Sequence, residues 1–455
     1  MTGSLVTFAA RSPTGCSECR RKKVKCCRNK PVCTRCSRFP RLCKYDMKFV
    51  PWANTTSKTI KHPIQSTVSS LPKQIIQPLS CHLVDDESRF YIHHFSTQTS
   101  ILLFPLAPPS FRERLVSSAL RAPSLLYALL AASCSHHARL ACNSTSQKNT
   151  LRYTDIALTA LQNALASQAD KVELSEVASA IVLCTNDACN GNPSSFYTHL
   201  SGAKHLLQSL VEQEHTGNEY SFVQWLAKWF ATLDVCASAS GSYRSVITND
   251  SYPLLETLPR PRLAQPDDLC GYSLELMPLI SRIGQLANQD PSLWSSPVIL
   301  DEISQLEAYT GIFYEPDQPG TLADTDSITR EEKMRNTNNA FASSALLHLY
   351  RRVYQFPKDH HMVRTAIQNI LRAVENLTAS STTIVLLLWP IFSAGCETDN
   401  AEERCSINMR MQHMESLGLG NFKQARAAMN SYWSSGTHLT WGQYLENHGS
   451  VFVLF

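Results

Sequence analysis

The sequence predicts a small binuclear zinc cluster domain made of two short helices and loops, followed by a large all-α helical domain. Six cysteines near the start of the chain form a doubled motif, and apolar residues recur at helical spacing from about residue 85 onward. A stretch with recurring prolines separates the two regions. We therefore expect three segments, with boundaries at 1–45, 46–84 and 85–455.

The cysteine motif is an internal repeat between residues 16 and 43. Each half reads C-x2-C-x6-C, and the second half follows the first at an offset of seventeen residues. A C-x2-C pair puts two sulfurs on one turn, where they can share a metal ion. Six thiolates satisfy two tetrahedral zinc ions only if two of the sulfurs bridge both metals. The spacing therefore predicts one cluster of two Zn2+ ions, with the ligands Cys16, Cys19, Cys26, Cys33, Cys36 and Cys43.

A disulfide knot and a redox C-x2-C pair are the structural alternatives. A knot needs an oxidising compartment, and residues 1–15 lack the apolar segment of a secretory signal. A redox pair needs a strand-turn-helix context, which a doubled motif among lysines and arginines does not supply. These considerations favour zinc.

The charge of the chain is unevenly distributed. Residues 1–50 carry thirteen Lys or Arg and two acids, a net charge of +11. Because the whole chain carries +4, the remainder carries −7. A basic head of this kind suits a polyanion, and nucleic acid is the expected partner. The run from Arg20 to Lys25 is expected to form a short helix at a metal-anchored turn.

The cysteine stretch resembles the Zn2Cys6 binuclear cluster domain of fungal transcription factors, with Gly15 and Pro31 also matching. The resemblance implies that Cys16 and Cys33 bridge the two zinc ions. It further implies that the short helix reads CGG triplets in the major groove of double-stranded DNA. The residues at the family's base-reading positions are Lys22 and Lys23, and lysine is a suitable donor to guanine. Other basic residues are expected to contact phosphates: Arg20, Arg21, Lys25 and Arg28.

Two features depart from the family pattern without removing a ligand. Cys27 directly follows the third cysteine, so its thiol could compete as a ligand. Pro40 lies inside the second half-repeat and should keep the second helix short.

Residues 46–84 are expected to be a linker, because prolines recur there among Ser, Thr, Lys and Gln. Many members of the family carry a dimerising coiled coil in this position, but this stretch shows no heptad pattern. We therefore expect the protein to bind DNA as a monomer or as a dimer formed through the helical body, with the monomer favoured.

Helical periodicity marks several segments after residue 85. Leucines at 151, 158, 161 and 165 are expected on one helix face, and another helix is expected to start at Asn192-Pro193-Ser194. A stripe that includes Trp229 and Phe230 is interpreted as core. The apolar end, residues 451–455, is expected to dock against the body.

This region resembles the fungal-specific transcription factor domain. The resemblance rests on four segments that occur in the family's order, namely 122–132, 199–207, 229–234 and 388–396. It implies a regulatory domain rather than a catalytic one.

No catalytic motif was found in the helical region. Neighbours on a helix point about 100 degrees apart, so the adjacent histidines at 93–94, 136–137 and 360–361 are each interpreted as ordinary residues rather than two-ligand sites. The sequence also contains no P-loop, G-x-S-x-G or H-E-x-x-H pattern. We therefore expect that the protein is not an enzyme. No run reaches the ~18 apolar residues of a membrane span, so a soluble protein without membrane contact is expected.

The leading hypothesis is a nuclear, zinc-dependent regulator of RNA polymerase II transcription, whose body acts through the transcription machinery, co-regulators or a ligand. Control of one pathway, such as a metabolic or biosynthetic gene cluster, is what the resemblance suggests. The alternatives are a regulator whose body senses a sterol-like molecule, a general RNA binder, and an enzyme with an appended zinc head. RNA binding is disfavoured because only Phe39 and Tyr45 offer stacking rings in the basic stretch.

Overall fold

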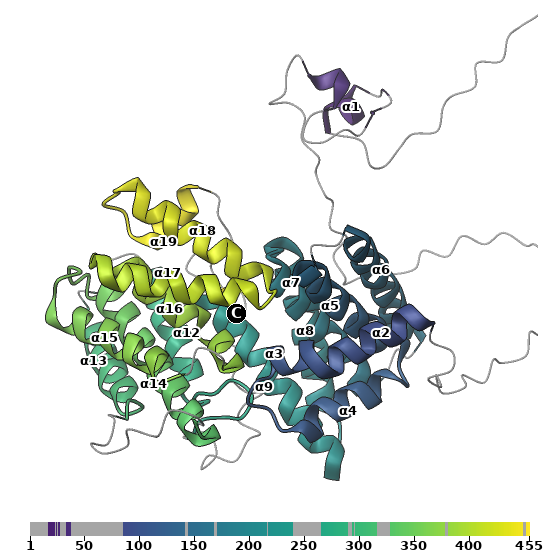
Figure 1. Cartoon of the computed structure of the whole chain (residues 1–455), viewed down its shortest axis with the longest axis horizontal. Coiled ribbons are helices and arrows are strands. Elements are labelled where there is room, and N and C mark those ends of the chain that lie inside the picture. Colours follow the sequence, from purple (N-terminus) through teal and green to yellow (C-terminus); the bar gives the residue numbers. More distant parts are fainter. Residues whose placement is uncertain are drawn as a thin grey trace, which may run out of the picture. The chain divides into compact units, whose positions relative to one another are not determined.

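The computed structural model describes residues 17–22, 24, 26–27, 33–37, 85–141, 144–167, 171–215, 217–239, 265–289, 294, 296–315, 328–377, 381–448 and 452–455. The chain divides into two compact units, Met1–Gln74 and Ile75–Phe455. The first unit contains α1 (Ser17–Arg21) and the 3-10 helix η1 (Thr34–Cys36). The second unit is the helical body (Figure 1). Its described elements are helices, which confirms the all-α class.

The N-terminal half of the body begins with three short elements that follow one another without a break. They are α2 (Asp86–His94), the π-helical turn η3 (Phe95–Thr99) and α3 (Ser100–Leu103). The longer helices of this half follow: α4 (Pro109–Ala119), α5 (Pro123–Ala141), α6 (Ser144–Ser167), α7 (Leu174–Asn190) and α8 (Pro193–Val211).

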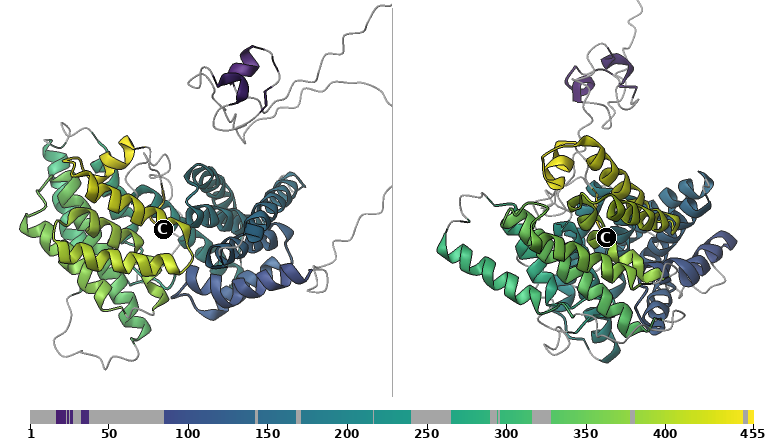
Figure 2. Two further views of the ribbon diagram at one scale, coloured as in Figure 1. Left: turned by 45° about the horizontal axis from the view of Figure 1, so that its top comes forward. Right: turned by 60° about the vertical axis from the view of Figure 1, so that its left-hand side comes forward.

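Helix α9 (Gly217–Ala239) leads into the C-terminal half of the body. That half contains α12 (Leu276–Ala287), α13 (Pro297–Gly311), α14 (Arg330–His348), the π-helical turn η5 (Leu349–Val353), α15 (His361–Glu375), the 3-10 helix η6 (Thr382–Leu387), α16 (Leu388–Glu397), α17 (Ala401–Ser416), α18 (Gly420–Ser435) and α19 (Trp441–Asn447). The two halves lie side by side (Figure 2).

Local sequence signals explain several helix ends. Helix α7 ends at Gly191, whose φ of 69° is the left-handed conformation that glycine adopts readily. Pro193 then begins α8, where its missing N–H costs no hydrogen bond, and the expected start of this helix is confirmed. Helix α14 begins with a capping box in which the side chains of Thr329 and Glu332 bind each other's backbone N–H groups.

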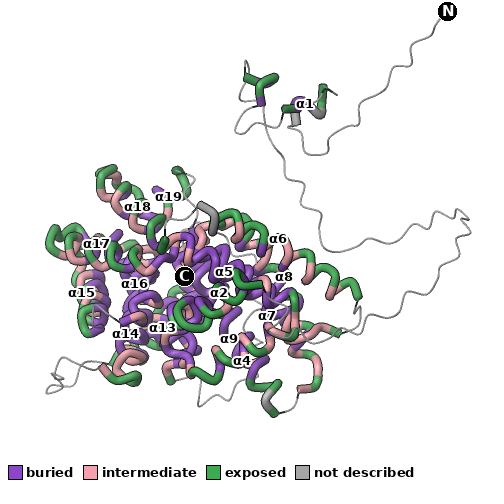
Figure 3. Tube along the Cα trace, turned by 45° about the vertical axis from the view of Figure 1, so that its right-hand side comes forward, coloured by how far each residue is buried: buried purple, intermediate pink, exposed green. Residues whose placement is uncertain are grey.

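Two hydrophobic cores fill the body, and α9 contributes to both. Trp229 and Phe230 of α9 pack into the core of the N-terminal half, whereas Val235 and Ala239 belong to the core of the C-terminal half. Residues 452–455 also connect the two cores. Val453 packs into the core of the N-terminal half, and Leu454 packs into the core of the C-terminal half. The buried segments lie along the inner sides of the helices (Figure 3). The expected core stripe and the expected docking of the C-terminal residues are both confirmed.

The apolar face predicted for residues 151–165 is only partly correct. Leu161 is buried, but the side chain of Leu151 is 73% exposed. Tyr153 and Ala157 occupy the buried face of α6 instead. Leu151 lies ten residues before Leu161, almost three turns, so the two side chains sit at different angles around the helix.

None of the helices that the structure describes combines the length and apolar character needed to cross a membrane.

Candidate metal centre and nucleic-acid interface

The first half of the cysteine repeat is organised by α1, which carries Cys19. At the end of α1, Lys22 N–H donates to Glu18 O at 2.9 Å, and Val24 N–H donates to Cys19 O at 3.0 Å. The chain then leaves the helix, so the expected helix over Arg20 to Lys25 is wrong in its bounds. A continuous helix would place Cys26 about 10 Å along the axis from Cys19, too far for both to bind one metal ion.

The second half of the repeat forms the shorter helix η1. Cys33 stands at its N-cap and Cys36 is its last residue, with Cys36 N–H donating to Cys33 O at 2.8 Å. Each half of the repeat therefore contains a short helix, as the sequence predicted.

The described cysteine sulfurs gather into a buried group. Cys19, Cys26, Cys33 and Cys36 form one cluster, and none of them is more than 6% exposed. The sulfurs of Cys19, Cys26 and Cys33 all lie within 4.8 Å of one another. Two of these residues come from the first half of the repeat and one from the second, so the two halves meet at this point.

The spacing of the sulfurs fits zinc. Cys19 Sγ and Cys33 Sγ are 3.7 Å apart. Ligands of a tetrahedral zinc ion with Zn–S bonds of about 2.3 Å are about 3.8 Å apart. The distance also excludes a disulfide between these two sulfurs, which would bring them to about 2.05 Å.

Several residues predicted for this site lie outside the described part of the chain. They are Cys16 and Cys43 among the metal ligands, and Lys23, Lys25 and Arg28 among the DNA contacts. Arg20 lies within α1, but its side chain is likewise outside the description.

Arg21 and Lys22 are the predicted DNA contacts whose side chains the structure describes, and Glu18 holds both. Glu18 accepts two hydrogen bonds from Arg21, at 2.9 and 2.8 Å, and lies 3.0 Å from Lys22 Nζ. The hydrogen bonds from Arg21, and then the one from Lys22, lower the pKa of Glu18 to about 2. The two cations remain 70% and 57% exposed, so each can still meet a polyanion.

Glu18 was not among the residues predicted from the sequence. The sequence does contain a signal for this role: Glu18 is followed by Arg21 and Lys22, three and four residues later. Side chains at these spacings are neighbours on one helix face.

Cys27 takes a different position from the buried cysteines. Its sulfur accepts a hydrogen bond from Thr34 N–H at 3.1 Å and lies 3.1 Å from Thr34 Oγ1. Cys27 is exposed and is not part of the three-sulfur group. This contact ties the end of the first half-repeat to the start of η1.

Comparison with protein families accounts for both units. Residues 14–49 match the fungal Zn(2)-Cys(6) binuclear cluster domain, and residues 89–454 match the fungal specific transcription factor domain. The chain is a Zn2Cys6 transcription factor. Together the two matches describe a DNA-binding, zinc-binding regulator of transcription, with its DNA-binding unit first and its fungal transcription factor domain second. No curated protein and no solved structure matches this Zn2Cys6 factor.

Proposed function

We propose that this Zn2Cys6 factor binds CGG triplets in double-stranded DNA and regulates transcription by RNA polymerase II in the nucleus. The observation that carries the proposal is the approach of Cys33 to Cys19 and Cys26. It joins the two halves of the repeat around one metal position, which is what a binuclear cluster requires.

The cluster is proposed to hold two zinc ions through Cys16, Cys19, Cys26, Cys33, Cys36 and Cys43. Bridging by Cys33 is supported by its sulfur, which lies within 4.8 Å of both first-half sulfurs although Cys33 belongs to the second half. Cys16 is the corresponding residue of the first half and is proposed as the second bridge. Zinc ions held there would stabilise the fold of a segment too short to form a hydrophobic core.

Base reading is assigned to Lys22 and Lys23, which would donate to guanine O6 and N7 in the major groove. Arg20, Arg21, Lys25 and Arg28 are assigned to phosphates. The exposure of Lys22, together with its contact to Glu18, supports a role in base reading, because a side chain that reads bases must be accessible and oriented. Arg21 shares both features, so its assignment to phosphate rests on its position in the family motif.

The helical body is proposed to regulate one pathway, such as a metabolic or biosynthetic gene cluster, through co-regulators or the transcription machinery. The proposed boundaries remain 1–45, 46–84 and 85–455, with DNA binding as a monomer or as a dimer formed through the body. The enzyme alternative has less support, because both matched families are transcription factor families.

The alternative of a body that senses a sterol-like molecule has little support from two apolar cavities among the described residues. One cavity between the two halves is lined by residues such as Leu102, Tyr272 and Leu454 and measures about 30 Å³. A second, near His136 and Trp229, measures about 10 Å³. Volumes of this size hold one or two water molecules.

The test is fluorescence anisotropy of the zinc-loaded full chain with a labelled duplex carrying one CGG triplet and with a scrambled duplex. We expect tighter binding to CGG, weakening with added salt, and loss of binding after chelation. Lys23→Ala should keep its zinc and reduce the preference for CGG by about 1 to 3 kcal/mol.

Equal loss of affinity for both duplexes in Lys23→Ala would refute the base-reading role of Lys23. Binding that survives chelation would refute the zinc-dependent reader as a whole. Saturation at one protein per triplet would favour the monomer.

A further inference from the structure

A polar hollow in the C-terminal half of the body has no part in the DNA-binding function proposed above. It measures about 390 Å³, within the range of about 300 to 1,000 Å³ typical of small-molecule sites. Its walls come from the segment after α14, from the turn between α16 and α17 together with the start of α17, and from the end of α18 together with the residues that follow it. The lining residues are Arg351, Lys358, Asp399, Arg404, Tyr432, Trp433 and 436–439.

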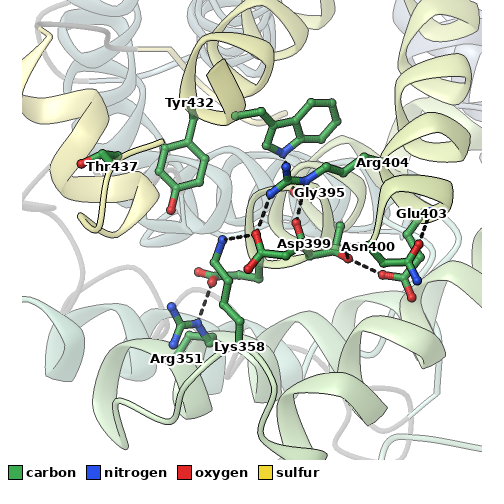
Figure 4. A network of polar contacts seen from close by, with 12 residues as sticks. Arg351, Lys358, Gly395, Asp399, Asn400, Glu403, Arg404, Tyr432 and Thr437 are labelled. Atoms are coloured by element: carbon green, nitrogen blue, oxygen red, sulfur yellow. Dashed lines mark hydrogen bonds and ion pairs between the residues drawn. The ribbon is translucent and has the colours of Figure 1, made fainter. Parts of the chain in front are cut away.

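Two cations in the hollow share one carboxylate. Lys358 Nζ donates to Asp399 Oδ1 at 3.1 Å, and Arg404 donates to the same oxygen at 2.6 Å. Figure 4 shows both side chains converging on Asp399. The third cation, Arg351, is neutralised separately by the buried Glu397 at 2.6 Å. Three cations thus meet two carboxylates, which leaves one positive charge unbalanced.

Donors remain available on both shared cations. Lysine has three N–H groups and arginine five. The contacts among the described residues use one of these on Lys358 and two on Arg404, whose Nε donates to Thr398 O at 2.8 Å. Asp399 is 64% exposed, so the place where the cations converge is open to solvent and to a ligand.

Two aromatic rings stand beside these cations and are held in place. Lys358 Nζ lies 5.5 Å from the centre of the Tyr432 ring, and the Arg404 guanidinium lies 5.3 Å from that of Trp433. Tyr432 donates its hydroxyl hydrogen to Leu439 O at 3.0 Å, and Trp433 donates its indole N–H to Gly395 O at 2.9 Å. The aromatic wall is therefore preorganised.

The backbone that presents Arg351 and Lys358 is irregular. Arg351 lies in the π-helical turn η5, and such turns occur often at functional sites. Gln355, between the two cations, has a φ of 57° in the left-handed region, which is unusual for a residue other than glycine. Arg351 also donates to Phe356 O, which holds this strained turn in place.

We propose that the hollow binds a small aromatic carboxylate. The carboxylate would accept hydrogen bonds from Lys358 and Arg404, and its ring would lie against the wall formed by Tyr432, Trp433 and Leu439. One negative charge on the ligand matches the one unbalanced positive charge of the hollow. Asp399 would repel a second negative charge on the ligand. This proposal rests on the proposed function, because it names the class of ligand that the regulatory body would bind. The binding itself does not require DNA.

The test is a calorimetric and ligand-observed NMR titration of the zinc-loaded full chain with 2-naphthoate. The comparison ligands are 2-naphthamide, which keeps the ring without the charge, and acetate, which keeps the charge without the ring. We expect saturable binding of 2-naphthoate that weakens as salt rises from about 50 to 300 mM. Binding of 2-naphthamide and of acetate should each be at least about tenfold weaker.

Two variants connect the binding to this hollow. Lys358→Gln should weaken 2-naphthoate binding about tenfold, and Lys358→Arg should restore most of it, because the charge-assisted hydrogen bond returns. The matched control is Lys171→Gln, which removes an exposed lysine paired with Glu173 at 3.7 Å and should leave binding unchanged. Melting temperatures of all three variants should equal that of the unmodified chain, which excludes unfolding as the cause.

Three outcomes would overturn the proposal: no saturable binding up to about 10 mM, equal binding of 2-naphthamide, or unchanged binding in Lys358→Gln. Binding of an acidic peptide but not of 2-naphthoate would also overturn it and would identify a protein-docking surface instead. CGG preference is measured on the same preparation without ligand. Its loss, with 2-naphthoate binding retained, would refute the DNA-binding proposal and leave this one standing.

Discussion

Glu18 shows how a single carboxylate can order two cations on a helix of five residues. With its pKa lowered to about 2 by Arg21 and Lys22, Glu18 is ionised throughout the physiological pH range. Its negative charge lies within the first turn of α1, where it also interacts favourably with the helix dipole. The proposed base-reading residue Lys22 is therefore oriented before DNA arrives, although the carboxylate offsets part of the positive charge that attracts phosphates.

The neighbouring pair Cys26 and Cys27 allows a sharp test of the metal ligands. Cys26 is buried against Cys19 and Cys33, whereas Cys27 is exposed and contacts Thr34. We expect Cys26→Ser to lower the zinc affinity by at least about tenfold, because a thiolate ligand is lost. Cys27→Ser should retain the zinc content of the unmodified chain, because Cys27 lies outside the sulfur group and a serine oxygen can still accept from Thr34 N–H. Zinc content after dialysis measures both.

Equal zinc loss in the two variants would mean that Cys27 is itself a ligand. In that case the set of six cysteines deduced from the spacing would need revision.

At the scale of the elements, α14 carries buried amides that hold other segments in place. Asn338 donates to Phe313 O at 2.7 Å and accepts from Ser273 N–H at 2.9 Å. Its neighbour Asn339 binds both backbone groups of Glu315, at 2.7 and 2.9 Å. Both asparagines are 4% exposed. Helix α14 thus anchors the segments before α12 and after α13 through these hydrogen bonds, in addition to apolar contacts such as the stacking of Tyr272 on Phe341.

Asn338→Ala should destabilise the body by about 2 to 6 kcal/mol. The substitution removes the partner of two buried backbone groups, and each such loss costs about 1 to 3 kcal/mol. The measurement is urea unfolding of the full chain followed by its helical circular dichroism. Gln305→Ala is the control, because Gln305 lies exposed on α13 and its side-chain amide donates to Asp301, one turn away, at 2.8 Å. Its effect should stay within about 0.5 kcal/mol, and a similarly small effect of Asn338→Ala would argue against the anchoring role.

At the scale of the whole body, two side chains of α5 connect its halves. His136 Nε2 lies 2.9 Å from Leu417 O, and Arg139 Nε donates to Gly418 O at 2.6 Å. Since a carbonyl oxygen can only accept, Nε2 carries the proton of neutral His136. The other ring nitrogen then accepts, with Thr99 Oγ1 at 3.0 Å and His94 Nε2 at 3.2 Å. Gly418 has a φ of 85° and approaches the rings and methyl groups of α5 so closely that a side chain there would clash.

This connection should make the stability of the body depend on pH. Burial lowers the pKa of His136 to about 4 from an ordinary value of 6.5. As the pH falls from 6.5 toward 4, the unfolded chain takes up a proton that the folded chain does not, so folding loses stability in that window. We expect His136 to account for a loss of about 1 to 2 kcal/mol at about pH 5.

Urea unfolding of the unmodified chain and of His136→Gln at several pH values measures this contribution. The glutamine can still donate to Leu417 O but does not titrate, so the variant should lose less stability on acidification. Parallel losses in the two proteins would show that His136 does not carry the effect.

Local sequence patterns predict more about the cysteine unit than about the polar contacts of the helical body. Cysteine spacing was sufficient to predict a metal cluster, because a few neighbouring residues set the relative positions of ligands that share a tight turn. The bounds of the first helix were predicted wrongly, because the requirement that Cys26 return to Cys19 overrides the helical propensity of the basic run. The three histidine pairs, taken one at a time, could not reveal that His94 and His136 from different pairs lie in contact.

The sequence by itself determined the doubled cysteine motif, the separation of a basic head from an acidic body, the all-α class of the body, and the burial of the Trp229 stripe and of residues 452–454. These features follow from local spacing and periodicity, which the chain carries without reference to distant residues. Only the tertiary structure decided which polar residues meet: Asn338 with Ser273, His136 with Leu417, and Lys358 with Arg404 at Asp399. The contacts of Asn338 with Ser273, of His136 with Leu417 and of Lys358 with Asp399 join residues 41 to 281 positions apart in the chain. They depend on how the helices pack, and no local pattern encodes them.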